Sequence, residues 1–178
     1  MAMTATPITM GAITSAKDYF LATFEREHAT TMRVLRAYPV GKLDLRPDAK
    51  CKTARELAWI FALERGLGQM VFQNMMATGS AAGGMPAAPE SWDAILGAIE
   101  KGHQDFVAVV RETSDAAMME HVKFFTAPKT LGDVTRLDFA WFLLHDEIHH
   151  RGQFSIYVRM AGGIVPSIYG PTAEEPWM

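Results

Sequence analysis

The 178-residue sequence lacks the features that mark several classes of protein. Its single cysteine, Cys51, allows no internal disulfide and indicates a reducing cytosol. No apolar segment approaches the roughly 20 residues that span a bilayer, and residues 1–11 lack the basic and apolar regions of a signal peptide. The formal net charge of −3 offers no concentrated basic patch for nucleic acid. We therefore expect a cytoplasmic protein that binds neither membrane nor nucleic acid.

The composition indicates a globular chain, with 49% apolar and 21% charged residues. Its length fits one domain over 1–178, of which 1–12 are expected to form a disordered tail. Apolar residues recur at three- and four-residue spacings in four stretches, which predicts helices near residues 14–38, 53–78, 91–113 and 133–161. The pattern favours an all-α fold, an antiparallel four-helix bundle with an irregular C-terminal tail.

The boundaries of these helices follow from capping and breaking residues. Candidate N-caps are Thr14 or Ser15, Thr53, Ser91 and Asp133. Glu56 stands three residues after Thr53 and would complete a capping box. A flexible linker is expected at 79–89 between the second and third helices, because glycine and proline are frequent there. The short apolar run at 122–125 predicts a loop or a brief extended piece.

The last predicted helix carries the densest polar cluster of the chain, with three histidines and two carboxylates within six consecutive positions. Residues four apart share a helix face, so Asp146 lies on the face of His150. His145 shares a neighbouring face with His149 for the same reason. Either pair has the spacing with which one helix offers two ligands to a divalent metal. Periodicity alone leaves open which pair faces inward.

Glu64 interrupts the apolar stripe of the second predicted helix. An unpaired carboxylate in that position would be costly, so Glu64 needs an arginine, a histidine or a metal as its partner. Gly66 and Gly68 lie beside it and lower the stability of the helix, which favours the close approach of a neighbouring helix. His28 and His103 also lie on or beside apolar stripes, where core histidines are more usual than ligands.

One motif in the last helix resembles that of a known family. Residues 149–153 read His-His-Arg-Gly-Gln, and Tyr-Val-Arg, Gly-Gly, Val-Pro and Tyr-Gly follow from position 157 onward. This combination resembles the DinB-like superfamily of four-helix proteins, also called YfiT-like metalloenzymes. The resemblance implies a bundle that binds Zn²⁺ or Ni²⁺ through three histidines, one on the second helix and a His-x-x-x-His pair on the last. Relatives in this superfamily include thiol-dependent transferases and isomerases that use low-molecular-weight thiols.

The chain departs from the family pattern at two of the three ligands. His150 takes the position of the last family ligand, but Asp146 stands where the family has the earlier histidine. The histidine of the second helix should fall near Trp59 or Ile60, and neither side chain binds a metal. The chain therefore resembles a divergent member with an incomplete metal-ligand triad.

Two functions are compatible with this pattern. In the first, His150, Asp146 and Glu64 hold a divalent transition metal, with His145 and His149 as the alternative pair, and the protein is a metal-dependent transferase or hydrolase. Arg151 and Gln153 are then candidates for substrate binding, although a structural salt bridge is the more usual role for an arginine such as Arg151. In the second function no metal is bound, and the bundle is a stress-related binding protein with a polar network in place of the ion.

Large apolar groups on the predicted helices and tail exceed what a small bundle buries. Trp92, Trp141 and the aromatic tail are the main examples. We therefore expect a homodimer that packs through helix faces.

Overall fold

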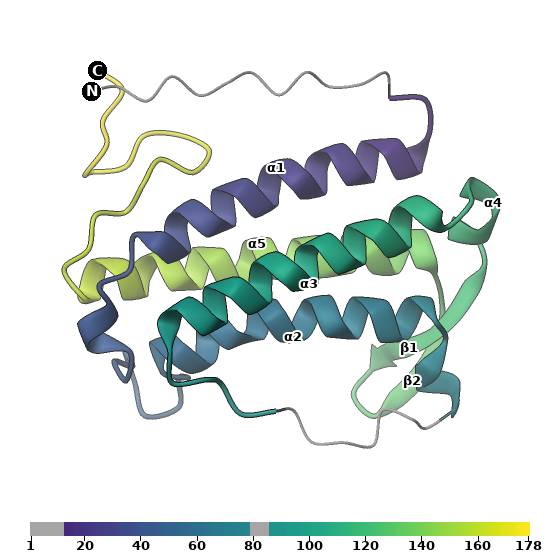
Figure 1. Cartoon of the computed structure of the whole chain (residues 1–178), viewed down its shortest axis with the longest axis horizontal. Helices are drawn as coiled ribbons and strands as arrows, with labels where there is room; N and C mark the ends of the chain where they lie inside the picture. Colours follow the sequence, from purple (N-terminus) through teal and green to yellow (C-terminus); the bar gives the residue numbers. More distant parts are fainter. Residues whose placement is uncertain (1–12, 79–85) are drawn as a thin grey trace.

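The computed structural model of the chain describes residues 13–78 and 86–178. The tail predicted for residues 1–12 and most of the linker predicted for 79–89 lie outside the described residues. The long helices are α1 (Ala16–Arg36), α2 (Ala54–Phe72), α3 (Trp92–Glu112) and α5 (Arg136–Met160) (Figure 1). Shorter elements are the 3₁₀ turns η1 (Val40–Lys42) and η2 (Met75–Thr78), the single turn α4 (Asp115–Met118), and the strands β1 (His121–Ala127) and β2 (Thr130–Thr135). Within the described ranges, no helix is long and apolar enough to cross a membrane.

The N-caps explain where the helices begin. The side chains of Ser15, Thr53 and Ser91 each accept a hydrogen bond from the backbone amide three residues later in the chain. Glu56 completes the capping box at Thr53. The prediction that Asp133 caps the last helix was wrong. Strand β2 continues through Asp133, which pairs with Lys123, so the helix begins later and Thr135 is its N-cap.

α2 also ends earlier than predicted, at Phe72 rather than near residue 78. Asn74 adopts a left-handed conformation, with φ of 56°, which breaks the α-helical hydrogen-bond pattern. A 3₁₀ turn follows instead. α5 ends as expected, because Gly162 takes the left-handed conformation, with φ of 83°, that favours glycine after a helix.

A two-stranded hairpin corrects the all-α expectation. β1 and β2 pair antiparallel, with Val122 opposite Val134 and Phe124 opposite Gly132. Val122 is buried, and the ring of Phe124 packs against Phe139 on α5 with centroids 4.6 Å apart. The hairpin forms because its apolar side chains find this contact at the end of the helices, a long-range effect that the short run at 122–125 does not reveal.

The four long helices pack as α1 on α3 and α5, and α2 on α3 and α5. Only two of these four pairs are antiparallel, so the predicted antiparallel arrangement needs correction. Gly102 of α3 lies against Arg65 and Phe106 lies against Gly68, which shows that α2 and α3 run in the same direction. α1 and α5 also run parallel (Figure 1). The long connection between α2 and α3 makes this possible, since it is long enough to return the chain along the length of a helix.

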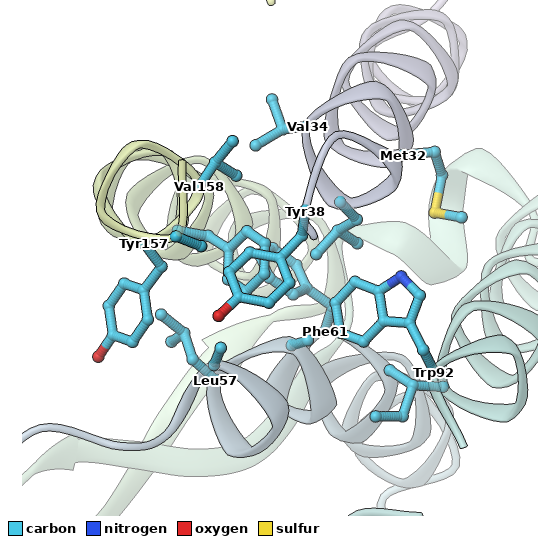
Figure 2. Close-up of a cluster of buried hydrophobic side chains, with 14 of the residues drawn as sticks. Met32, Val34, Tyr38, Leu57, Phe61, Trp92, Tyr157 and Val158 are labelled. Carbon is cyan, nitrogen blue, oxygen red and sulfur yellow. The ribbon is translucent and has the colours of Figure 1, made fainter. Parts of the chain in front are cut away.

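Two apolar clusters fill the interior, and buried polar side chains separate them along the helix axes. The first cluster, drawn in Figure 2, is built around Met32, Phe61, Trp92 and Phe154. The second is built around Phe24, Val71, Phe106 and Leu143. On each long helix most of the buried polar residues fall between the positions of the two clusters. We call the following residues the polar layer: Glu27, His28, Thr31, Glu64, Arg65, His103, Glu147 and Arg151. The candidate functional groups lie in or beside this layer.

Candidate metal centre

Glu64, Asp146 and His150 come together where α2 faces α5. One ligand atom from each lies within 4.8 Å of the others. His150 Nδ1 is 2.7 Å from Glu64 Oε1 and 3.9 Å from Asp146 Oδ1. Glu64 is 5% exposed, whereas Asp146 and His150 are partly exposed at the rim of the polar layer. The group forms because Asp146 and His150 are four residues apart on α5 and therefore share the face that α2 contacts.

The electrostatics of Glu64 and His150 favour one retained proton. Burial raises the pKa of the Glu64 carboxyl, and the hydrogen bond and charge of His150 only partly oppose this shift. The hydrogen bond to Glu64 raises the pKa of His150 and outweighs the effect of its burial. A cation that binds these groups must displace that proton, so its affinity should rise with pH.

The donor set fits a divalent ion. Glu64 Oε2 is buried and has no hydrogen-bond partner among the described residues. A second bond partner on that carboxylate would offset the cost of burying it. Two ligands each about 2.1 Å from one ion lie at most ~4.2 Å apart. The three ligand atoms of this group lie within 4.8 Å of one another. Only a small movement of the side chains would therefore bring them to distances at which all three bind one ion.

The alternative histidine pair does not join this group. His145 and His149 are both exposed. The ring of His145 lies beside Trp141, with centroids 6.1 Å apart. Gln153 Nε2 lies 2.8 Å from His149 Nε2. These two histidines therefore point away from Glu64, on the outer face of α5.

The two candidate substrate-binding residues lie in different environments. Arg151 is 1% exposed, and its guanidinium donates to Glu27 Oε2 at 2.7 Å. It also donates to Thr31 and to the hydroxyl of Tyr169 in the C-terminal tail. Gln153 is exposed and lines a cleft that also includes His150. Arg151 thus fastens α5 to α1 and the tail, while Gln153 is accessible to a ligand.

Glu147 is the main residue of this region that sequence reasoning missed. It is fully buried. Its carboxylate accepts hydrogen bonds from Arg65 Nη2 at 2.6 Å and from Thr31 Oγ1 at 2.7 Å. The buried face of α5 is centred on Glu147 and Arg151. It lies about 100° around the helix from the face of Asp146 and His150, and nearly opposite the face of His145 and His149. The only available signal was spacing, because Leu143, Glu147 and Arg151 recur every four residues.

The packed helices and the carboxylate–histidine group define a mainly helical protein with a candidate metal centre. The family profile of the DinB superfamily matches residues 23–154, which include all three residues of this group. The chain belongs to the DinB superfamily. The resemblance inferred from the His-His-Arg-Gly-Gln motif is thereby confirmed.

Individual relatives agree with this membership. The chain is 26% identical over 159 residues to the uncharacterised protein YrdA of Bacillus subtilis (strain 168), covering 89% of this chain and 90% of YrdA. A crystal structure of a DinB-like protein from Bacillus cereus superposes with a TM-score of 0.66 at 22% identity, over 84% of this chain and 95% of that one. The DinB-like protein YjoA from B. subtilis gives a TM-score of 0.65 at 14% identity, over 84% and 97%. These two structures support the fold.

Proposed function

We propose that the protein binds a divalent transition metal, Zn²⁺ or Ni²⁺, through Glu64, Asp146 and His150 and acts as an enzyme on a small molecule. The observation that carries this proposal is the buried Glu64 carboxylate, which has one oxygen on His150 and the other without a hydrogen-bond partner among the described residues. An ion at this position would supply a Lewis acid that polarises a substrate atom, as in metal-dependent transferases and hydrolases. We also propose that the fold is a four-helix bundle, which the pairwise packing of the four long helices supports.

The surrounding residues would hold the ligands in place. Arg65 follows Glu64 directly and is anchored by its buried ion pair with Glu147. Arg151 follows His150 and is anchored in the same way by Glu27. The edge of the His150 ring packs on Phe61, with centroids 6.3 Å apart. Each ligand therefore neighbours a fixed residue, which limits the conformations open to the site.

A second candidate function is a binding protein without a metal. The contact of 2.7 Å between His150 and Glu64 is a complete charge-assisted hydrogen bond when His150 is protonated. Trp59 and Ile60 also stand near the place where the family has its second-helix histidine. In this case the pair has a structural role, and the adjoining cleft would bind a ligand without transforming it.

Metal content separates the two candidates. The full chain would be purified without an affinity tag or added metal and subjected to elemental analysis, together with His150→Ala. His145→Ala is a matched control, since His145 lies one turn away on the exposed face. We expect about one zinc or nickel per chain in the wild type and in His145→Ala, and a loss of metal in His150→Ala. Metal-free wild-type protein that fails to take up either ion on addition would favour the second candidate.

We also propose that the protein forms a homodimer through α5. Trp92 is buried in the first apolar cluster and therefore does not support dimer formation, but α5 leaves Phe142 and Met160 about half exposed on one face. Gly152 lies on the same face with open space where a Cβ would stand. A second copy of α5 can therefore approach closely, which suits a twofold interface.

A further inference from the structure

A cleft of about 430 Å³ lies beside the candidate metal centre and includes His150 in its wall. The loop before α2 contributes Lys50 and Lys52, and α5 contributes Gln153. The less polar part of the wall is formed by Cys51, Leu57, Ile156 and Tyr157. Clefts of this volume accommodate a small organic molecule. A molecule in the cleft would therefore lie against His150.

The charge in this cleft is of one sign. Two lysines line it, and none of the lining residues in the described part of the chain is an aspartate or a glutamate. Neither lysine forms an ion pair with any residue that the structure describes, whereas Lys101 and Lys123 elsewhere pair with aspartates at 2.6 and 2.9 Å. Two unpaired cations at one concave surface attract an anion. An adjoining cleft shares both lysines and also contains Arg46 and Glu56, which form an ion pair with each other at 3.8 Å. The two lysines therefore lie where the two clefts meet.

The loop that carries the two lysines is held in place before any ligand arrives. The hydroxyl of Tyr157 on α5 donates to the carbonyl of Lys52 at 2.8 Å. The Lys50 amide donates to Asp48 Oδ1 at 2.9 Å, and Thr53 begins the capping box of α2. Figure 2 shows Tyr157 at the edge of the apolar cluster near Leu57, with its hydroxyl pointing away from the core. A fixed loop lowers the entropic cost of binding.

We propose that this cleft binds the carboxylate or phosphate group of a small organic substrate between Lys50 and Lys52. The apolar part of the substrate lies along Leu57 and Ile156, and the remainder reaches His150. Gln153 uses its amide nitrogen on His149 and keeps its carbonyl oxygen for a donor on the substrate. The assignment of the His150 end as the reactive end rests on the proposed metal-dependent function.

Calorimetric titration of the full chain tests the proposal, with succinate and methyl phosphate as anionic probes and succinamide as the neutral analogue of succinate. Each is titrated into metal-free and zinc-loaded protein. We expect at least one anion to bind and succinamide to show no binding. The anion that binds more tightly identifies the carboxylate or the phosphate as the preferred group. Replacing both lysines, Lys50→Gln with Lys52→Gln, should weaken anion binding about tenfold or more, the loss typical of a charged hydrogen bond.

The matched control replaces two exposed lysines outside the cleft that have no ion pair within the described residues, Lys42→Gln with Lys129→Gln, and lowers the net charge equally. It should change the affinity by less than about twofold. Three results would overturn the proposal. They are equal anion affinities in the two double variants, succinamide that binds as tightly as succinate, and no binding of either anion. Zinc binding is measured on the same samples. A chain that binds no zinc but keeps lysine-dependent anion binding contradicts the metal-dependent function and leaves the anion site standing.

Discussion

Two glutamates of the polar layer, Glu64 and Glu147, are buried to a similar degree but compensated differently. Burial alone would raise the pKa of Glu147, but the charge of Arg65 and the hydrogen bonds from Thr31 and Arg65 hold that pKa below its usual value. Burial raises the pKa of Glu64, and the hydrogen bond and charge of His150, with a smaller effect of Arg65, only partly oppose this shift. Glu147 thus belongs to a satisfied structural pair, whereas Glu64 still offers an acceptor.

Removal of the Glu147 charge should be costly. Glu147→Gln leaves the buried guanidinium of Arg65 without its counter-charge, so we expect the free energy of unfolding to fall by about 3–5 kcal/mol. Asp105→Asn removes an exposed pair with Lys101 and should change it by less than ~1 kcal/mol. Urea denaturation followed by circular dichroism measures both. Similar small effects for the two variants would show that the buried pair contributes no specific stability.

The stacked histidines of the polar layer predict a pH dependence. The ring of His28 stacks on His103 with centroids 3.6 Å apart, and burial, followed by the charge of His103, lowers the pKa of His28. Below about pH 6.5 the unfolded chain takes up a proton that folded His28 resists. The free energy of unfolding should therefore fall with acidification, by up to about 1.4 kcal/mol per pH unit, until the folded pKa is reached.

Denaturation curves between pH 7.5 and 5 measure this effect. His28→Gln should flatten the slope below about pH 6.5. The matched control is His121→Gln, since His121 is exposed on the hairpin and should leave the slope unchanged. An identical slope in wild type and His28→Gln would contradict the assignment.

At the scale of elements, the hairpin decides where α5 begins and therefore which residues of α5 face α2. Thr135 Oγ1 accepts from the Asp138 amide and caps the helix directly after β2. We expect Thr135→Ala to lower the melting temperature, in line with a typical loss of about 1 kcal/mol for an N-cap. Asp133→Ala, which removes only an exposed pair with Lys123, is the control and should have less effect. The reverse order in differential scanning calorimetry would restore Asp133 as the cap.

Many of the helix boundaries were predictable from the sequence, and the features that were not have physical causes. The capping box at Thr53 and the stop at Gly162 are local, so residue types within a few positions are enough. The rotation of α5 was not predictable, because polar residues at its centre, Glu147 and Arg151, find partners on α1 and α2. The need of Glu64 for a partner followed from burial alone, whereas the hairpin depended on a distant contact.

At the scale of the whole molecule, the exposed face of α5 predicts self-association. Size-exclusion chromatography with light scattering should give twice the chain mass of 19.7 kDa. Gly152→Glu places a charge in the proposed interface without disturbing the isolated chain, since open space surrounds Gly152, and should yield a monomer. Gly97→Glu on α3 meets the same open space and is the matched control, expected to remain dimeric. A wild-type monomer at micromolar concentration would rule out this assembly.

We propose that Glu64 takes the ligand role that the family resemblance assigns to a histidine on the second helix. Calorimetric titration of zinc into metal-free protein at neutral pH tests it most directly, with Glu64→Gln compared with His149→Ala. We predict one site per chain in wild type and in His149→Ala, because His149 lies on the exposed face. Glu64→Gln should weaken zinc binding by at least about 100-fold, more than the loss of a supporting group. Equal zinc affinity in wild type and Glu64→Gln would contradict the claim.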